Sequence, residues 1–394
     1  MKTFSQQLGK ILSPLFVQKL SKTGVSVKLP LDKTDVPADK TTLNVTDWSF
    51  FTDVLLGYDL GFAESYLKGK WDTIDLTTLF THFNTANGKT TASKIGNLAP
   101  LKLWGRLIQS MRSSNNLYWA SKNIKEHYDF SNEFFSSFLD SSMTYSSGLF
   151  DNESDDLKDA QLRKLNTILN RAAVKNMDHI LDIGCGWGSL ITQAASEFGC
   201  KATGITLSEN QYSYSNDLIQ QQGLKNDISV KLLDYRNLSG LYDHIFAVEM
   251  LEAVGHKGLQ EFFTNCKRLL KPGGTLQLQV IVVPDDRYSS YRKNCDFIQK
   301  YVFPGGLLPS KAAINDAANR NGLHIKETHS IGAHYVNTLQ RWANNFESKL
   351  DNLRNIGFSE RDLRRFKYYF RYCEVAFSSG HIDNLQISLE KRPT

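Results

Sequence analysis

The chain has 394 residues, 41% of them apolar and 22% charged, which is typical of a soluble globular protein with one large domain and room for a smaller one. Its net charge of +5 is modest, and no apolar run approaches the roughly 18 residues of a membrane-spanning helix, so a transmembrane protein is not expected. The 5 cysteines and 9 histidines show no disulfide or metal-ligand spacing, so we expect a reducing compartment and no metal.

The first 85 residues are expected to form a small accessory domain of α/β type that associates with lipid. Residues 25–31 (VSVKLPL) and 41–47 (TTLNVTD) have the composition of strands, and residues 48–72 have a helical pattern. The first 20 residues are amphipathic, but polar residues and a proline interrupt any signal-peptide core, which favours a cytoplasmic protein.

Residues 86–125 are expected to form a basic linker followed by an amphipathic helix. From Lys89 to Lys125 there are seven Lys or Arg and no Asp or Glu, and aromatic and aliphatic residues are interleaved with them. Such a segment suits an anionic membrane surface, and a solvated linker is the alternative reading. Nucleic acid is not expected as a partner.

From about residue 155 the sequence alternates between strand and helix patterns, which predicts an α/β fold with a parallel, doubly wound, Rossmann-like sheet. The C-terminal end differs. Residues 323–332 (LHIKETHSIG) and 384–391 (NLQISLEK) bracket two helical stretches, as the strands of an antiparallel final hairpin would.

Gly184, Gly186 and Gly188 lie between a buried strand and a helix in the stretch ILDIGCGWGSL. Glycines let the backbone turn sharply and approach a ligand, and a helix N-terminus favours a carboxylate or a phosphate. The spacing differs from the GxGxxG of dinucleotide-binding proteins. Asp182 precedes the turn, and a carboxylate beside N–H donors suits an amino-acid zwitterion better than a pyrophosphate.

This turn resembles the S-adenosylmethionine site of class I methyltransferases, and further motifs narrow the resemblance. In chain order they are HYDFSNEFF, MTYSSGLF, LDIGCGWG, GITLSENQ, LDYR, EMLEAVG, FIQKYVFPGGLLPS, GAHYVNTLQRW and YCEVAF. Together they resemble the cyclopropane-fatty-acyl-phospholipid synthase family, which includes the mycolic acid cyclopropane synthases, over about residues 120–392. The stretch LLGYDLGFAESYLKGKWD also resembles the accessory domain of the full-length members.

The resemblance implies a methyltransferase catalytic domain over residues 126–394, with S-adenosyl-L-methionine as cofactor and a membrane phospholipid as substrate. It further implies a homodimer and a peripheral location on the inner face of the membrane. Glu209 or Gln211 would hold the ribose, and Tyr235 would lie against adenine or pack in the core. The cofactor-binding residues that it implies are Tyr145, Ser146, Asp182, Gly184, Cys185, Gly186, Gly188, Thr206, Leu207, Ser208, Gln211, Tyr235 and Arg236.

The family's reaction adds the cofactor's methyl group to a double bond of an acyl chain, and loss of a proton from that methyl then closes a cyclopropane ring. The resemblance implies a bicarbonate ion as base, held by Cys, Glu, His and Tyr. The Glu and Tyr positions are Glu252 and Tyr335. The other two are changed to Ser147 and Gln279, and a glycine position is occupied by Glu249.

These changes leave several outcomes open. Ser147 and Gln279 can still donate hydrogen bonds to an anion, as can the backbone N–H near Ile281, whereas the carboxylate of Glu249 would repel it. Glu249 is therefore a candidate base or cation stabiliser, and the alternative is a bond to a neighbouring backbone group or to Arg292. The product is a cyclopropane, a methylated alkene, or a methyl branch if a reductase partner supplies hydride. A non-catalytic cofactor-binding membrane partner is a further alternative.

Three further features of the sequence are interpreted from their neighbouring residues. Cys373 matches a family cysteine but lacks an adjacent histidine, so a packed core thiol is expected. His127 is a candidate for positioning a lid over the cofactor. The stretch FIQKYVFPGGLLPS is expected to fold over the acyl chain or to be a packed connection, with apolar surface and turns supplied by Phe297, Tyr301, Phe303, Gly305 and Gly306.

Overall fold

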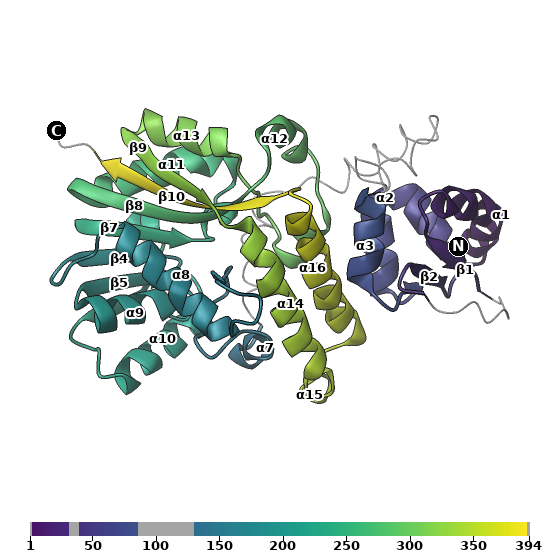
Figure 1. Cartoon of the computed structure of the whole chain (residues 1–394), viewed down its shortest axis with the longest axis horizontal. Helices are drawn as coiled ribbons and strands as arrows, with labels where there is room; N and C mark the ends of the chain where they lie inside the picture. Colours follow the sequence, from purple (N-terminus) through teal and green to yellow (C-terminus); the bar gives the residue numbers. More distant parts are fainter. Residues whose placement is uncertain (1, 31–38, 86–129, 392–394) are drawn as a thin grey trace. The chain divides into compact units, whose positions relative to one another are not determined.

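The computed structural model describes residues 2–30, 39–85 and 130–391, which form two compact units (Figure 1). Of the described residues, unit 1 comprises 2–30, 39–85, 294–304 and 349–379, and unit 2 comprises 130–293, 305–348 and 380–391. The basic linker and helix predicted at 86–125, and His127, lie outside the described residues. The predicted domain boundaries did not anticipate that two segments from the second half of the chain pack with the N-terminal part.

Unit 1 contains a small three-stranded sheet and helices, which confirms the expected N-terminal α/β domain. The sheet order is β1-β2-β3, with β1 and β2 parallel and β2 and β3 antiparallel. Its elements are α1 (Lys2–Ser21), β1 (Ser26–Lys28), β2 (Thr42–Val45), α2 (Ser49–Leu67), β3 (Trp71–Asp72), α3 (Leu76–Thr85), the π-helix η3 (Ile298–Val302), α15 (Leu350–Asn355) and α16 (Glu360–Ser378).

The helix predicted over residues 48–72 is too long by one turn. It ends at Leu67, because Gly69 adopts a left-handed backbone (φ 67°) and Lys70 N–H bonds back to the carbonyl of Ser65. The reversal lets Trp71, which is fully buried, pair with β2. A backbone turn of this kind leaves the apolar pattern unchanged, so periodicity alone does not reveal it.

Unit 2 is built on a seven-stranded sheet in the order β6-β5-β4-β7-β8-β10-β9. The first five strands in this order are parallel, and β10 pairs antiparallel with both β8 and β9. The predicted fold class and the antiparallel C-terminal strands are therefore confirmed. The strands are β4 (His179–Ile183), β5 (Lys201–Thr206), β6 (Ile228–Leu232), β7 (Tyr242–Val248), β8 (Leu270–Val282), β9 (Leu323–Ser330) and β10 (Asp383–Lys391).

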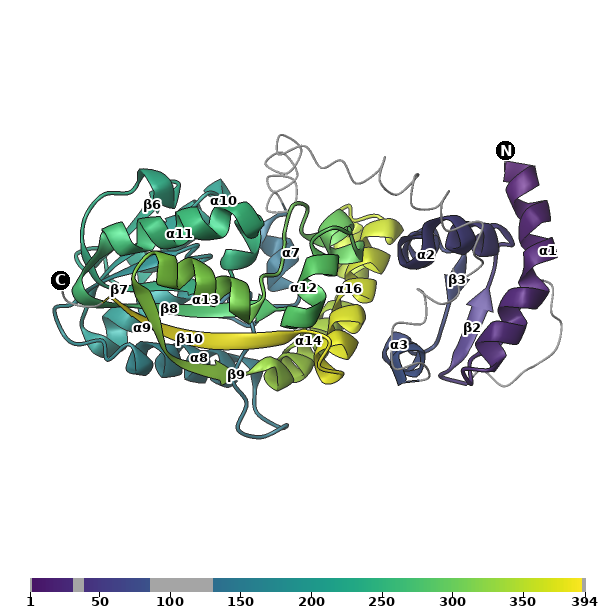
Figure 2. The same ribbon diagram turned by 90° about the horizontal axis from the view of Figure 1, so that it is seen from above.

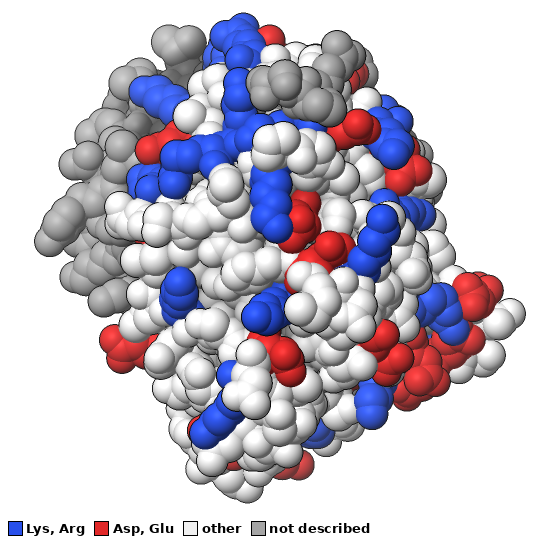
Figure 3. Space-filling model, turned by 90° about the vertical axis from the view of Figure 1, so that its left-hand side faces the viewer, with Lys and Arg blue, Asp and Glu red and all other residues white. Residues whose placement is uncertain are grey.

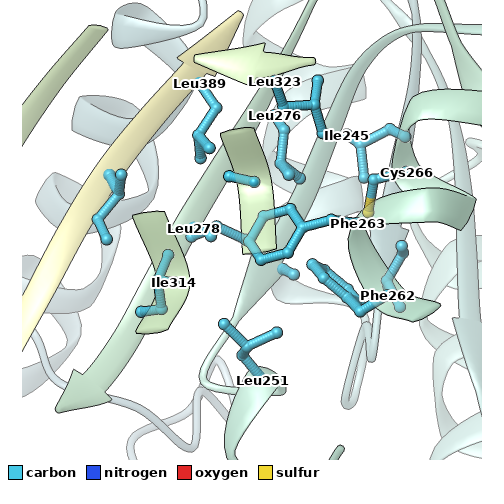
Figure 4. Close-up of a cluster of buried hydrophobic side chains, with 14 of the residues drawn as sticks. Ile245, Leu251, Phe262, Phe263, Cys266, Leu276, Leu278, Ile314, Leu323 and Leu389 are labelled. Carbon is cyan, nitrogen blue, oxygen red and sulfur yellow. The ribbon is translucent and has the colours of Figure 1, made fainter. Parts of the chain in front are cut away.

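Helices cover both faces of this sheet (Figures 1 and 2). One buried cluster joins α8 (Leu157–Arg171), α9 (Ser189–Phe198) and α10 (Glu209–Gln221) to one face. A second cluster joins α11 (Gly255–Leu269) and α13 (Lys311–Arg320) to the opposite face, where their apolar side chains interlock with those of β7 and β8 (Figure 4). The arrangement places the carboxyl ends of β4, β5 and β7 at one edge, where ligands bind in doubly wound folds.

Strands β8 and β10 each have one apolar face and one polar face. Leu276, Leu278 and Ile387 point into the apolar cluster, whereas the alternate residues on the other face are polar and buried. This polar face comprises Gln277, Gln279, Asn384, Gln386 and Ser388. Buried polar side chains need hydrogen-bond partners, so this polar row must bond within itself or to the elements packed against it.

The remaining elements of unit 2 are short, apart from α14. They are α7 (Asn132–Ser136), the 3-10 turns η1 (Tyr235–Asn237) and η2 (Leu251–Ala253), α12 (Asp285–Tyr291) and α14 (Gly332–Ser348). Three helices, not the two predicted, separate β9 from β10. No helix of the described residues is long and apolar enough to cross a membrane. On the face drawn in Figure 3, basic and acidic side chains are interspersed.

Candidate active site

The glycine turn follows β4 and leads into α9. Gly184, Gly186 and Gly188 all have left-handed backbones, with φ of 82°, 55° and 91°. A Cβ on Gly184 would lie 2.8 Å from the side chain of Met250, whereas a Cβ on Gly186 would meet nothing within 4 Å. The turn is therefore packed at its first glycine and open at its second, so a ligand can approach the backbone at Gly186.

Asp182 ends a buried strand directly before this turn, and its Oδ1 has no hydrogen-bond partner among the described residues. Burial raises its pKa to about 7, and the charge of Lys164 opposes that rise. Lys164 is itself fully buried on α8, and it donates to the Ser146 hydroxyl at 2.8 Å. A buried carboxylate with an unused oxygen is suited to accept a hydrogen bond from a bound cationic group.

The carboxyl end of β5 presents a second group of predicted residues. Thr206 donates its hydroxyl to Gln211 Oε1 at 2.6 Å, and Ser208 caps α10 by accepting from the Gln211 N–H. Leu207 between them is 66% exposed, and Glu209 is exposed in the first turn of the helix. Gln211 is thus fixed by Thr206, and the exposed Leu207 leaves apolar surface for a ligand.

Tyr235 and Arg236 lie in η1, after β6. Tyr235 is half-buried and packs edge-on against Phe262 of α11, which matches the core-packing alternative. Arg236 is exposed and makes two hydrogen bonds to Asp234, at 2.9 and 2.6 Å. The hydrogen bond and charge of Arg236 lower the pKa of Asp234, so η1 presents an ionised carboxylate rather than a free guanidinium.

Glu249, directly after β7, lies where four buried donors converge. Its Oε1 accepts from the backbone N–H of Ser147 at 3.1 Å, and its Oε2 accepts from the Tyr335 hydroxyl at 2.7 Å. Two side-chain amides also donate to Oε1, Gln279 at 2.8 Å and Asn384 at 2.7 Å. Donors alone surround the carboxylate, so the site is built for a negative charge.

The backbone supports this placement of Glu249. Its N–H donates to the carbonyl of Gln279 at 2.7 Å, and its φ of 52° is uncommon for a residue with a side chain. Ser147, Gln279 and Asn384 are fully buried, whereas Glu249 keeps partial exposure. The carboxylate is therefore held by buried groups, while the residue as a whole stays partly exposed. Glu249 bonds a neighbouring backbone N–H, that of Ser147, which was one of the predicted alternatives. Arg292, the other predicted partner, lies over the ring of Tyr288.

Glu252, in η2, is oriented by the backbone of β8. Its Oε1 accepts from the N–H of Ile281 at 2.6 Å, and its buried Oε2 has no partner among the described residues. Burial, and then the charge of Glu249, raise the pKa of Glu252 to about 8. The Ile281 N–H, which the sequence offered to a bound anion, is therefore occupied by Glu252, and this carboxyl holds its proton at neutral pH.

A stability measurement tests this protonation. Because the pKa of Glu252 is raised above its ordinary value of 4.5, the folded state is stabilised below pH 4.5 relative to higher pH, and that advantage is lost as pH rises to about 8. Glu252→Gln removes the titration. We expect the variant to be more stable than the wild type by about 2–4 kcal/mol at pH 9, and much closer to it at pH 5. Unfolding curves at both pH values would refute this if the difference were independent of pH.

Aromatic side chains border the anion cradle. Tyr145 lies 5.4 Å from Phe135, 5.8 Å from Phe138 and 5.2 Å from Trp342, measured between ring centroids. Trp342 in turn contacts Tyr335, the cradle donor on α14. Aromatic faces attract cations and exclude water, so the predicted residue Tyr145 belongs to a wall suited to an electron-poor carbon centre.

The stretch FIQKYVFPGGLLPS divides between the two units. Phe297, Tyr301 and Phe303 belong to unit 1, where Phe297 packs against Tyr368 of α16 at 4.5 Å. The part from Gly305 onward belongs to unit 2, where the N–H of Leu307 donates to the backbone carbonyl of Glu252 at 2.8 Å. The second half of this stretch therefore contacts the turn that carries Glu252.

The cysteines are not activated in the way a nucleophile requires. Cys185 in the glycine turn and Cys373 on α16 both have pKa values raised by burial, which disfavours the thiolate. No group of three or more His, Cys, Asp or Glu within residues 2–30, 39–85 and 130–391 is placed to hold a metal.

The family model for mycolic acid cyclopropane synthetase matches residues 116–387, well over half of the chain. The chain belongs to this family. Membership confirms the resemblance found in the sequence motifs, and it makes S-adenosylmethionine-dependent modification of lipid acyl chains the class of activity.

Two curated members of the family cover most of the chain. Tuberculostearic acid methyltransferase UfaA1 of Mycobacterium tuberculosis is 36% identical over 343 residues, which span 84% of this chain and 78% of that protein. Cyclopropane-fatty-acyl-phospholipid synthase of Escherichia coli K12 is 32% identical over 375 residues, spanning 93% and 90%. The cyclopropane synthase MmaA2 from M. tuberculosis aligns with a TM-score of 0.65 at 28% identity, over 68% of this chain and 98% of that one.

The cyclopropane synthase CmaA1, solved with SAH and CTAB, aligns with the same TM-score and identity. The present chain fits the family's cofactor. Asp182 offers an unpartnered buried oxygen, Gly186 leaves open space, and both lie at the sheet edge where the fold binds ligands. Two residues of the site escaped the sequence analysis, Asn384 and Lys164, and the polar alternation of β10 was the signal for the first.

Proposed function

We propose that this protein transfers a methyl group from S-adenosylmethionine to the double bond of a phospholipid acyl chain and forms a cyclopropane, with Glu249 as its built-in base. The observation that carries the proposal is the carboxylate of Glu249 held by Ser147, Gln279, Tyr335 and Asn384. In the family that the sequence resembles, the residues at the positions of Ser147, Gln279 and Tyr335 hold a bicarbonate ion together with the residue at Glu252. Here a side chain supplies the carboxylate at the point where the donors meet.

The cofactor supplies an electrophilic methyl group when bound. Asp182 and the backbone at Gly186 would hold its amino-acid part, and Thr206 and Gln211 lie where its ribose would be held. The π electrons of the acyl double bond would form the new carbon–carbon bond as the methyl–sulfur bond breaks and its electron pair stays on sulfur, giving S-adenosylhomocysteine. This leaves a positive charge on the neighbouring acyl carbon. The wall around Tyr145 and Trp342 stabilises that charge and keeps water away from it.

The carboxylate of Glu249 then accepts a proton from the newly added methyl group. The electron pair of that C–H bond closes the three-membered ring onto the cationic carbon, and Glu249 becomes a neutral acid. A methyl group beside a carbocation is a strong acid, so a carboxylate is a sufficient base. Protonated Glu252 adds no second negative charge that would raise the energy of ionised Glu249.

A lipid assay tests this proposal. Purified protein is incubated with methyl-labelled S-adenosylmethionine and vesicles of monounsaturated phospholipid, in buffer stripped of dissolved carbon dioxide. We expect labelled acyl chains that gain one methylene and show cyclopropane ring protons by NMR. Tight cofactor binding with no label in lipid would instead support the non-catalytic membrane partner.

A second outcome of the same transfer has its own support, because the relative at 36% identity is named a methyltransferase rather than a cyclopropane synthase. Loss of a different proton would give a methylated alkene, and hydride from a reductase partner would give a methyl branch. Vinyl or branched-methyl NMR signals in place of ring protons would identify these products, and addition of a reduced nicotinamide or flavin system would separate the two.

We also propose that the protein docks on anionic membrane through α1. Phe4, Ile11 and Leu15 form one exposed stripe on this helix, with exposed fractions of 71%, 73% and 55%. The first 31 residues carry five lysines and no acidic residue. Apolar residues can enter the lipid interface, and each lysine near an anionic leaflet contributes about 1 kcal/mol.

Replacing Phe4, Ile11 and Leu15 by Ser should weaken binding to phosphatidylglycerol vesicles at least about tenfold in sedimentation assays, since roughly 1.5–3 kcal/mol of burial is lost for each side chain that enters lipid. Activity on detergent-dispersed lipid should change little. Met177→Ser and Leu241→Ser are the control, because both side chains are equally exposed but lie in unit 2. Equal loss of binding in the control would argue against α1.

A further inference from the structure

A chain of hydrogen bonds leads from the surface of α8 to Glu249 through the polar face of the sheet. Arg171, the last residue of α8, donates from its guanidinium to Gln386 Oε1. Gln386 Nε2 donates to Gln279 Oε1 at 3.0 Å, and Gln279 Nε2 donates to Glu249 Oε1 at 2.8 Å. Both glutamines are buried, so neither can exchange its partners for water.

The direction of each hydrogen bond in this series follows from the groups that the side chains carry. A glutamine amide can rotate to present either oxygen or NH₂, so an isolated Gln279 could offer its oxygen to Glu249 and repel the carboxylate. Arginine only donates, so Gln386 must present oxygen to it and NH₂ to Gln279. Gln279 must then accept at its oxygen, and its NH₂ faces Glu249 and the backbone carbonyl of Ser147, which lies 3.4 Å away.

We infer that Arg171 and Gln386 are positioning residues, which fix the orientation of Gln279 so that a donor always faces Glu249. The inference rests on the proposed role of Glu249 as base, because a donor that faces the carboxylate stabilises its negative charge. Two aligned amide dipoles extend the polarity of the guanidinium into the site. Arg171 therefore acts on Glu249 without touching it.

Other charged and titratable groups act on Glu249 or on the groups around it, and the test keeps them constant. Lys164 of α8 is electrostatically coupled to it, and so is Glu252 of η2. Tyr335 of α14 donates to it, and Asp182 of β4 is coupled to Lys164. Glu327 of β9 is coupled to Arg171. The test therefore uses substitutions that leave every one of these groups in place.

Gln386→Met breaks the series of hydrogen bonds between Arg171 and Gln279 without adding a charge, and Gln277→Met is the matched control. Gln277 lies on the same face of β8 with the same burial, but it bonds Ser388 rather than the chain to Glu249. The cofactor-free protein is titrated by infrared spectroscopy, and the band of the protonated Glu249 carboxyl is identified by its loss in Glu249→Gln. We expect the titration of Glu249 to move up by about one pH unit in Gln386→Met alone.

A shift in both Met variants, or in neither, overturns the inference. Arg171→Gln and Arg171→Lys guard against misfolding of the buried variants, because Arg171 is only partly buried. The neutral glutamine can accept and should shift the titration, whereas lysine donates only and should restore it. In a Gln279→Met background, Gln386→Met should produce no further shift.

The pH dependence of kcat separates this inference from the proposed function. If Glu249 is the base, the acidic limb of the kcat profile follows the infrared titration in each variant. An infrared shift with an unmoved acidic limb would uphold the role of Arg171 and Gln386 in orientation, and it would contradict Glu249 as the base.

Discussion

Glu249→Gly is expected to lose at least about a thousandfold in kcat and to regain much of it when bicarbonate, formate or acetate is added. The substitution removes the carboxylate but leaves its donors, Ser147 N–H, Gln279, Tyr335 and Asn384, around an open space. A small carboxylate can enter that space and take the proton in place of the side chain. The measurement is the initial rate of lipid labelling as a function of anion concentration.

Glu249→Gln is the matched control for this rescue. It fills the same space with a neutral amide, so it should be inactive and should not respond to added anions. The backbone of the glycine variant is not strained, because glycine adopts the left-handed backbone at this position (φ 52°) without the cost of about 1–2 kcal/mol borne by other residues. Full activity of Glu249→Gly without added anion would eliminate Glu249 as the base.

Gly186→Ala should weaken the binding of S-adenosylhomocysteine more than about tenfold, which is about 1.4 kcal/mol, in titration calorimetry. The open space beside Gly186 is where a ligand would approach the backbone, and a methyl group there occupies part of it. Activity should fall in parallel at subsaturating cofactor.

Gly223→Ala separates this contact from backbone strain. Gly223 has φ of 72°, and a Cβ there would also meet nothing within 4 Å, but it lies in the turn after α10. Both variants bear the same left-handed alanine, so both should lose similar stability in thermal unfolding. Only Gly186→Ala should lose affinity for the cofactor product. Equal affinities in the two variants would show that the cofactor product does not bind at the glycine turn.

The sequence was informative about the fold because its signals are local. Strand and helix periodicity identified the parallel sheet, and the glycines between β4 and α9 identified the turn. Packing between distant segments was not predictable in the same way. The amphipathic pattern of α16 shows that one face is buried, but it does not say against which element, and that face packs within unit 1.

In the candidate site, too, the sequence identified individual residues but not how they are arranged in space. Ser147, Glu249, Gln279 and Tyr335 were all named from motifs, but their convergence on one carboxylate depends on the order of strands in the sheet. Asn384 was missed because its strand, β10, is last in the chain yet lies beside β8. Lys164 was missed because a lysine within a helix is usually solvated, and only the structure shows it fully buried.

The left-handed backbone at Glu249 also bears on how such a site can change during descent. Glutamate and glycine codons differ by a single nucleotide, and both residues can occupy this conformation once the surrounding fold imposes it. A single mutation could therefore replace the side-chain carboxylate at this position by an open space for a free anion, or the reverse, without a change in the surrounding fold. Under the proposed role of Glu249, a requirement for a dissolved carboxylate or bicarbonate would then be a trait that one substitution turns on or off.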